Sequence, residues 1–319
     1  MTHSPLHYER LRLRHLRLLQ LIDEHGSLRS AASALNLTQP AVSQMLKDLE
    51  FAMGVPLVDR SVRGVVLTET GLLALRRSRS GLATLDQLVR ELDAGQTLSL
   101  RIGTNSALMY NIIPEALRLL EVGRSKTRFQ LKTGLVGDMV EALSEGELDC
   151  YVGRLDWDQV PPRIARLLTY DPLLDTDLIL ICPVDHPVAG LETPRARDLV
   201  GWPWAMPSRE SNNRIVLESA MRSTGAAGLT AAVEVSADPN GLINLALALG
   251  MLTCVPRVAL NEHSHARDFK VLDVANLELS SIRIGFATTA ELRQMPEIAD
   301  LREAMLRAAR TWTARTNEG

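Results

Sequence analysis

Residues 27–64 have the sequence SLRSAASALNLTQPAVSQMLKDLEFAMGVPLVDRSVRG, and this stretch decides the fold of the N-terminal part of the chain. Small residues around Ala31 predict a short helix on which another helix packs closely. Thr38 is placed to cap that next helix, because its hydroxyl can accept a hydrogen bond from an amide of the first turn. Pro40 falls within the same turn, where a missing N–H costs least. The stretch therefore predicts two helices joined by a tight turn.

The second of these helices has one apolar face and one polar face. Val42, Leu46 and Leu49 recur at helical spacing and predict the side that packs on a core. The other side carries hydrogen-bonding groups that match the base edges of DNA, although periodicity alone favours a plain helical bundle equally well. For the DNA reading, we expect contacts to base edges from Gln39, Ser43 and Gln44, contacts to thymine methyl groups from Pro40 and Ala41, contacts to phosphates from Lys47, Arg60 and Arg63, and further contacts from Ser27, Arg29 and Thr38.

A family resemblance separates these two alternatives. The run AASALNLTQPAVSQMLKDLE at residues 31–50, followed by GVPLVDR and RGVVLTETG, resembles the LysR-type transcriptional regulators. The resemblance is dense from residue 11 to about 95 and looser beyond. Val58 departs from it, because the family usually has Phe after Leu57, and this affects packing beside the wing. The resemblance implies an all-α winged helix-turn-helix domain, a long linker helix, and a two-lobed α/β domain similar to type 2 periplasmic binding proteins.

We predict that the chain has three parts. They are a winged helix-turn-helix DNA-binding domain at residues 10–67, a linker or dimerisation helix at 68–95, and an effector-binding domain at 96–319, whose first lobe spans about 98–163 and 269–312 and whose second lobe spans about 164–268. Beyond the linker, short strands alternate with helical segments, which is typical of an α/β domain.

The segment from about residue 69 to 94 predicts a long helix with a stripe of leucines. A small winged domain cannot bury this stripe, so we expect the same helix of a second subunit to cover it. Packing against the chain's own C-terminal domain is the alternative. The resemblance implies a homodimer and, from two dimers, a homotetramer.

Composition excludes several classes of protein. The 319 residues are 46% hydrophobic and 23% charged, as in ordinary globular proteins. The sequence contains no apolar run of about 18 residues, so we expect no membrane span. The polar N-terminus does not resemble a signal peptide, and we therefore expect the protein in the cytoplasm. Cys150, Cys182 and Cys254 are far apart in apolar surroundings, so we expect buried thiols and no disulfides.

Charge is unevenly distributed along the chain. Residues 1–90 contain 12 Lys and Arg against 8 Asp and Glu, whereas the remainder contains 23 against 30. The excess positive charge therefore lies in the part that carries the helix pair, which supports a contact with phosphates.

The loops that follow the predicted strands are candidate effector-binding segments. Ligands of open parallel sheets bind beyond the carboxyl ends of the strands, where helix N-termini offer free amides. We expect effector contacts from Thr104, Asn105, Ser106, Val136, Arg154, Ser208, Ser211, Asn212, Asp238, Pro239 and Asn240. Arg154 is placed to pair with an anion, and Val136, at a position where relatives commonly have Ser or Thr, indicates a less polar ligand end. Helix capping is the alternative role for each polar residue taken singly.

Signals of catalysis are weak. The sequence contains no P-loop, G-x-G-x-x-G or G-x-S-x-G motif, and His263 and His265 lack the neighbours of a metal site. We therefore expect neither an enzyme nor a cofactor or metal.

The hypothesis is a ligand-responsive transcriptional regulator that binds an inverted repeat in double-stranded DNA. We expect a small-molecule effector, either an anionic aromatic compound or one derived from a sugar, with RNA polymerase as a further partner and no membrane contact. One alternative is a solute-binding protein with an accessory helical domain, which predicts a signal peptide and no recognition helix. The other is an α/β enzyme with a fused helical domain, which requires a catalytic constellation.

Overall fold

The computed structural model describes residues 11–61, 64–93, 98–123, 127–157, 159–226, 228–236 and 238–317. The chain forms two compact units, Met1–Thr97 with Ser144–Glu147, and Leu98–Leu143 with Leu148–Gly319. Within the described residues, no helix combines the length and the apolar character needed to cross a bilayer.

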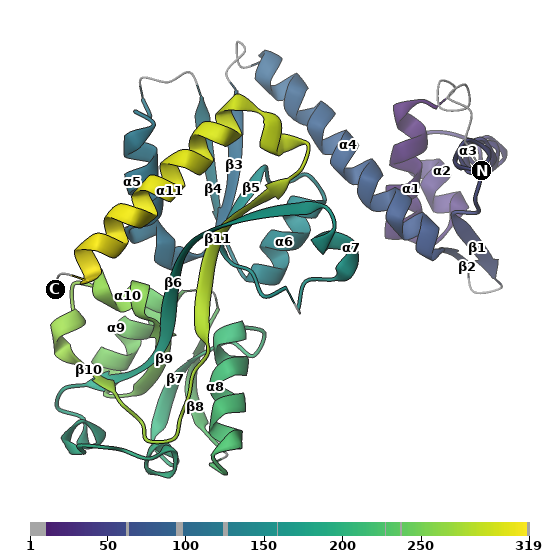
Figure 1. The fold of residues 1–319 in the computed structure, drawn as a ribbon. Coiled ribbons are helices and arrows are strands. Elements are labelled where there is room, and N and C mark those ends of the chain that lie inside the picture. The colour runs from purple at the N-terminus through teal and green to yellow at the C-terminus, as the bar shows by residue number, and fades with distance from the viewer. Residues whose placement is uncertain are drawn as a thin grey trace. The chain divides into compact units, whose positions relative to one another are not determined.

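The N-terminal unit is a helical domain with a two-stranded wing (Figure 1). Its elements are α1 (Leu13–His25), α2 (Leu28–Ala34), α3 (Gln39–Met53), β1 (Val58–Ser61), β2 (Gly64–Leu67) and α4 (Glu69–Asp93). The strands of the wing pair antiparallel, with Val58 opposite Leu67. The predicted helix-turn-helix with its wing is therefore confirmed.

One apolar cluster holds this unit together. Leu18 and Ile22 of α1 pack with Leu46 and Leu49 of α3, and all four side chains are buried. Val58 is buried in the same cluster, so strand β1 is packed with valine at the position where the resemblance implies a larger Phe.

The C-terminal unit is an α/β domain, as predicted. Its strands are β3 (Ser99–Thr104), β4 (Arg128–Thr133), β5 (Cys150–Arg154), β6 (Leu168–Pro183), β7 (Pro203–Pro207), β8 (Thr230–Val235), β9 (Leu252–Pro256), β10 (Phe269–Leu272) and β11 (Ser281–Thr289). Its α-helices are α5 (Ile112–Leu119), α6 (Val136–Ser144), α7 (Pro162–Ala165), α8 (Asn212–Ser223), α9 (Pro239–Leu249), α10 (Arg257–Asn261) and α11 (Pro296–Asn317).

Strand β6 links two lobes of this domain. The strand order is β4-β3-β5-β11-β6-β9-β7-β8, and β10 pairs with β6 off this path. Parallel pairs β3–β4 and β3–β5 form the first lobe, and parallel pairs β7–β8 and β7–β9 form the second. The long antiparallel strands β6 and β11 run through the middle of the domain (Figure 1).

The observed division between the lobes differs from the predicted one in two places. Residues 168–177 of β6 pair with β11, so the chain passes into the second lobe near Leu178 and not near residue 164. The assignment of residues 269–272 to the first lobe is wrong, because β10 pairs with Leu180–Pro183 in the second-lobe half of β6. A short strand carries too few side chains to show which neighbour it pairs with.

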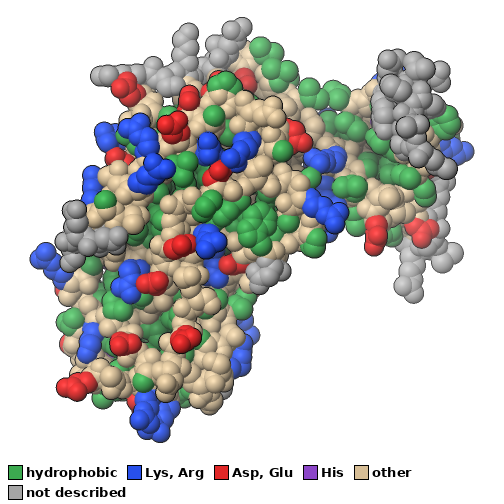
Figure 2. All heavy atoms as spheres, in the orientation of Figure 1, with side chains coloured by type: hydrophobic (Ala, Val, Ile, Leu, Met, Phe, Trp, Pro, Cys, Tyr) green, Lys and Arg blue, Asp and Glu red, His purple; other side chains and the backbone are tan. Residues whose placement is uncertain are grey.

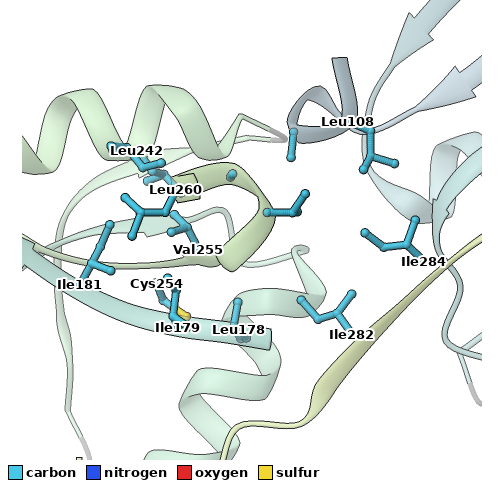
Figure 3. Packing of buried hydrophobic residues seen from close by; sticks show 14 of the residues in the cluster. Leu108, Leu178, Ile179, Ile181, Leu242, Cys254, Val255, Leu260, Ile282 and Ile284 are labelled. Atoms are coloured by element: carbon cyan, nitrogen blue, oxygen red, sulfur yellow. The ribbon is translucent and has the colours of Figure 1, made fainter. Parts of the chain in front are cut away.

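The larger of two apolar clusters in this domain contains residues of both lobes. Figure 3 shows Leu242 of α9, Cys254 of β9 and Ile282 and Ile284 of β11 among its members. The cysteines are buried free thiols, as expected, and burial raises the pKa of Cys182 to about 11.

Candidate functional site

Helix α3 starts where the sequence predicts and for the predicted reason. The Thr38 hydroxyl accepts a hydrogen bond from the Ala41 amide at 3.4 Å, and Pro40 occupies the first turn. Asn36 supplies the turn before the helix with a φ of 54°, a left-handed conformation that asparagine tolerates well. Gly54 ends the helix with a φ of 70°.

One side of α3 is free of core contacts in this unit. Gln39, Pro40, Gln44 and Lys47 are exposed, whereas Val42 and its apolar neighbours are buried. Since Pro40, Gln44 and Lys47 are separated by three or four residues, they share one helix face. The Gln44 amide donates to Asp48 at 2.8 Å along this face.

The other residues expected to contact DNA differ in their exposure. Ala41 and Ser43 are half-buried on α3, and Arg29 is exposed on α2. Ser27 caps α2, because its hydroxyl accepts the Ser30 amide at 3.1 Å. Of the two wing arginines, Arg63 and the side chain of Arg60 lie outside the described residues.

Sequence reasoning missed the residue that fastens the wing to α3. The Glu50 Oε1 atom accepts backbone amides from Leu57 at 2.8 Å and Val58 at 3.3 Å. The wing also contacts the turn after α1, where the Val65 amide donates to the Gly26 carbonyl at 3.1 Å. An acidic residue near the end of a helix, shortly before a strand, was the available signal.

The candidate effector site is a cavity of about 110 Å³ between the lobes. A well-studied cavity of about 150 Å³ accepts a benzene molecule, so this one suits a compact ligand. Seven of the expected residues line it: Asn105, Val136, Arg154, Ser211, Asn212, Asp238 and Pro239. Apolar side chains including Leu242, Ile282 and Ile284 complete its wall.

Four expected residues do not line this cavity. The Thr104 hydroxyl is buried and donates to the Val152 carbonyl at 2.8 Å, which makes it a link between β3 and β5. Ser106 donates to Asp238 at 3.5 Å. Ser208 and Asn240 are buried next to lining residues, and the Ser208 Oγ and Asn240 Nδ2 atoms have no hydrogen-bond partner within the described part of the chain.

Some residues that line the cavity also cap helices, which is the alternative role expected from the sequence. The Asn105 side chain accepts the Leu108 amide at 3.2 Å, and the Asp238 carboxylate accepts the Asn240 amide at 3.1 Å. Ser211 begins α8 without a side-chain cap, so amides of that first turn remain available at the cavity. Capping and lining are therefore combined at this site.

Arg154 has a partner that sequence reasoning did not supply. Its Nε atom lies 2.7 Å from Asp156 Oδ1 and 2.6 Å from Oδ2, and its Nη1 atom donates to Asn213 at 3.4 Å. Asn212 donates to the same carboxylate at 2.6 Å. This group of four residues connects the end of β5 in one lobe with the start of α8 in the other (Figure 1).

The position of α8 depends on a second arginine that was also missed. Arg214 is 7% exposed and donates to the Pro207 carbonyl at 3.2 Å, to Glu234 at 2.6 Å and to Glu218 at 2.8 Å. The bonds to Pro207 and Glu234 fix the first turn of α8 to β7 and β8, and with it the lining residues of the loop between β7 and α8.

Comparison with known proteins agrees with both parts of this geometry. The family model described as "Bacterial regulatory helix-turn-helix protein, lysR family" matches residues 13–72, and "LysR substrate binding domain" matches residues 93–310. The HTH-type transcriptional regulator GbpR of Azospirillum brasilense is 32% identical over 242 residues, covering 75% of this chain and 69% of the relative.

Solved structures share the fold. ArgP from Mycobacterium tuberculosis matches with a TM-score of 0.61 at 18% identity, covering 94% of this chain and 98% of ArgP. Full-length OxyR from Pseudomonas aeruginosa, in a variant with one cysteine replaced by aspartate, matches with a TM-score of 0.57 at 20% identity, covering 93% of this chain and 95% of OxyR.

A winged helix-turn-helix domain followed by a two-lobed α/β domain defines a class of DNA-binding transcriptional regulators. The chain belongs to the LysR family of these regulators, which is not a family of enzymes.

Proposed function

We propose that this LysR-family protein binds an inverted-repeat operator as a homodimer and responds to a small-molecule effector held in the cleft. The observation that supports operator binding best is the exposed face of α3 shared by Pro40, Gln44 and Lys47, with Gln39 also exposed at the start of the helix. A helix with polar side chains on its free face fits the major groove, where base edges present donors and acceptors.

Helix α4 supports the proposed dimer. Leu85, Leu88, Val89 and Leu92 recur at helical spacing, and they are 38% to 57% exposed. In Figure 2, apolar side chains lie on the surface over this helix. An isologous pair of α4 helices would bury them and would set two copies of α3 in two-fold relation, which requires a palindromic site. Association of two such dimers gives the expected homotetramer.

Operator binding can be tested by selecting bound sequences from random DNA with the full-length protein and then footprinting a selected site. We expect an inverted repeat whose half-sites lie about one helical turn, or a whole number of turns, apart. Selected sequences without two-fold symmetry would contradict the dimeric arrangement.

The cavity supports the proposed effector response, because its walls come from both lobes. A ligand that bridges the lobes binds best when they are close together and so changes the population of domain conformations. A thermal-shift screen of small metabolites, followed by footprinting with each stabilising compound, tests this step. A stabilising compound that leaves every footprint unchanged would contradict effector switching.

We propose that the regulator works in the cytoplasm, with RNA polymerase as its partner at the promoter.

A further inference from the structure

The chemistry of the effector is restricted by the pairing of Arg154 with Asp156. The Arg154 side chain is 11% exposed and the Asp156 side chain 20%, so both charges are largely removed from water. The Asp156 carboxylate accepts hydrogen bonds from both Arg154 Nε and Asn212 Nδ2. The carboxylate is therefore held on two sides, by the guanidinium and by the Asn212 amide.

This pairing leaves the cavity without net positive charge. Arg154 is the one cationic residue among the described residues that line it, and Asp156 neutralises it. The other two charged lining residues, Glu210 and Asp238, are acidic. A ligand carboxylate would meet these two negative charges and would have to compete with Asp156 for Arg154.

We propose that Asp156 determines the effector specificity of this regulator by excluding carboxylates and selecting an uncharged compound with hydroxyl, amide or carbonyl groups. This inference rests on the proposed effector site. Displacing Asp156 would leave a poorly solvated carboxylate without its counter-charge, which is strongly unfavourable. An uncharged oxygen avoids that cost and can accept from Arg154, whose Nη2 group has no hydrogen-bond partner in the described part of the chain.

The remaining lining groups suit the same class of ligand. Carboxylates of Glu210 and Asp238 accept hydrogen bonds from ligand hydroxyl or amide groups. Asn213 adds an uncharged amide, and the uncapped first turn of α8 offers backbone N–H donors to a ligand oxygen. Of the two ligand classes expected from the sequence, the anionic aromatic one is thus disfavoured.

The test measures a reversal of charge preference with an acid and its amide, benzoate and benzamide. Apparent dissociation constants are obtained from thermal shifts of the full-length chain at fixed ionic strength. Asp156→Asn keeps the size and the oxygen acceptor but releases the charge of Arg154. We expect this variant to bind benzoate at least about tenfold more tightly than the wild type does, and more tightly than it binds benzamide.

Two control variants show that the effect belongs to the pair. Asp138→Asn removes one exposed carboxylate from the start of α6 and should not raise benzoate affinity. The double variant Arg154→Gln with Asp156→Asn should lose the gain. A benzoate affinity of Asp156→Asn within about threefold of the wild-type value would overturn the proposal, whether both proteins bind or neither does.

Two further measurements keep the outcomes distinct. If Asp156→Asn does not fold, Arg154→Gln alone decides: an unchanged benzoate response supports the proposal, and a lost response contradicts it. Mobility shifts with operator DNA are run on the same preparations. Intact operator binding without a gain in benzoate affinity refutes only the role of Asp156, whereas wild-type protein that binds no operator refutes the proposed function.

Discussion

Helix α4 passes so close to Leu57 that a Cβ atom on Gly71 would lie 1.9 Å from the Leu57 carbonyl oxygen. The neighbouring residues hold this approach in place, since the Thr68 hydroxyl accepts the Gly71 amide at 2.9 Å and the Thr70 hydroxyl donates to the Pro56 carbonyl at 2.8 Å. The linker helix thus packs against the segment just before β1 at a distance that only glycine permits.

Replacing Gly71 by alanine should therefore destabilise the N-terminal unit. Backbone atoms must move to relieve the clash, and overpacking of this kind typically costs about 1–3 kcal/mol. Gly81→Ala is the matched control on the same helix, because a Cβ there meets nothing within 4 Å. We expect Gly81→Ala to stabilise by about 0.5–1 kcal/mol through helix propensity. Thermal unfolding followed by circular dichroism compares the two variants; equal shifts would contradict the close contact.

The bond from Glu50 to the wing predicts a local effect. Glu50→Ala leaves the Leu57 and Val58 amides without their acceptor, so hydrogen exchange in the peptide that contains them should become faster. The opening free energy should fall by about 1–3 kcal/mol. Glu24→Ala, which removes an exposed carboxylate from α1, is the control and should leave this peptide protected. Unchanged exchange in Glu50→Ala would show that the wing does not depend on this carboxylate.

If the protein dimerises through α4, a charged residue introduced among the exposed apolar residues of this helix should separate the subunits. Leu88→Asp places a carboxylate in the proposed interface, and we expect at least about a hundredfold weaker dimer, since an unpaired buried charge is costly. Arg90→Ala, on the same turn of the helix, should leave the dimer intact. Sedimentation equilibrium gives the dimer dissociation constants of both variants. A Leu88→Asp protein that remains as dimeric as Arg90→Ala would place the interface elsewhere.

His186 predicts a dependence of stability on pH. Its side chain is buried against Trp202 and its Nδ1 atom accepts the Val188 amide at 3.2 Å. Burial lowers its pKa below the usual value of 6.5. The unfolded chain then binds a proton more readily than the folded one, so this stability is present above pH 6.5 and lost as pH falls through the lowered pKa.

The measurement is the unfolding temperature of the C-terminal unit between pH 7 and pH 5, in the wild type and in His186→Gln. We expect the variant to lose part of the decline seen in the wild type. His263, whose pKa burial also lowers, contributes separately, so His263→Gln should retain the part due to His186. Identical pH profiles for wild type and His186→Gln would show that this imidazole does not titrate differently in the two states.

Local signals in the sequence predicted the DNA-binding part well. The cap at Thr38, the proline in the first turn and the apolar spacing of Val42 and Leu46 act within a few residues, so they fix α3 whatever the rest of the chain does. The cleft loops could also be predicted, because chain topology places the ends of parallel strands at one edge.

Partners set by tertiary structure could not be predicted. The sequence shows Arg154 and Asp156 two residues apart, but whether they pair or point to opposite sides depends on how the chain turns after β5. Thr104 looks like its neighbours Asn105 and Ser106, yet its hydroxyl is turned inward to the Val152 carbonyl. The pairing of β10 with β6 likewise depends on where two distant segments meet.

The most direct test of the central claim compares operator DNA with random DNA for Gln39→Ala, Ser43→Ala and Lys47→Ala. The claim is that the exposed face of α3 recognises bases. Mobility shifts over a range of salt concentrations give both affinities, with Gln130→Ala on β4 as the control. We expect Gln39→Ala and Ser43→Ala to weaken operator binding by about 1–3 kcal/mol and to leave random-sequence binding nearly unchanged. Lys47→Ala should weaken both and reduce the salt slope by about one. Equal losses on operator and random DNA for Gln39→Ala and Ser43→Ala would contradict recognition of bases by α3.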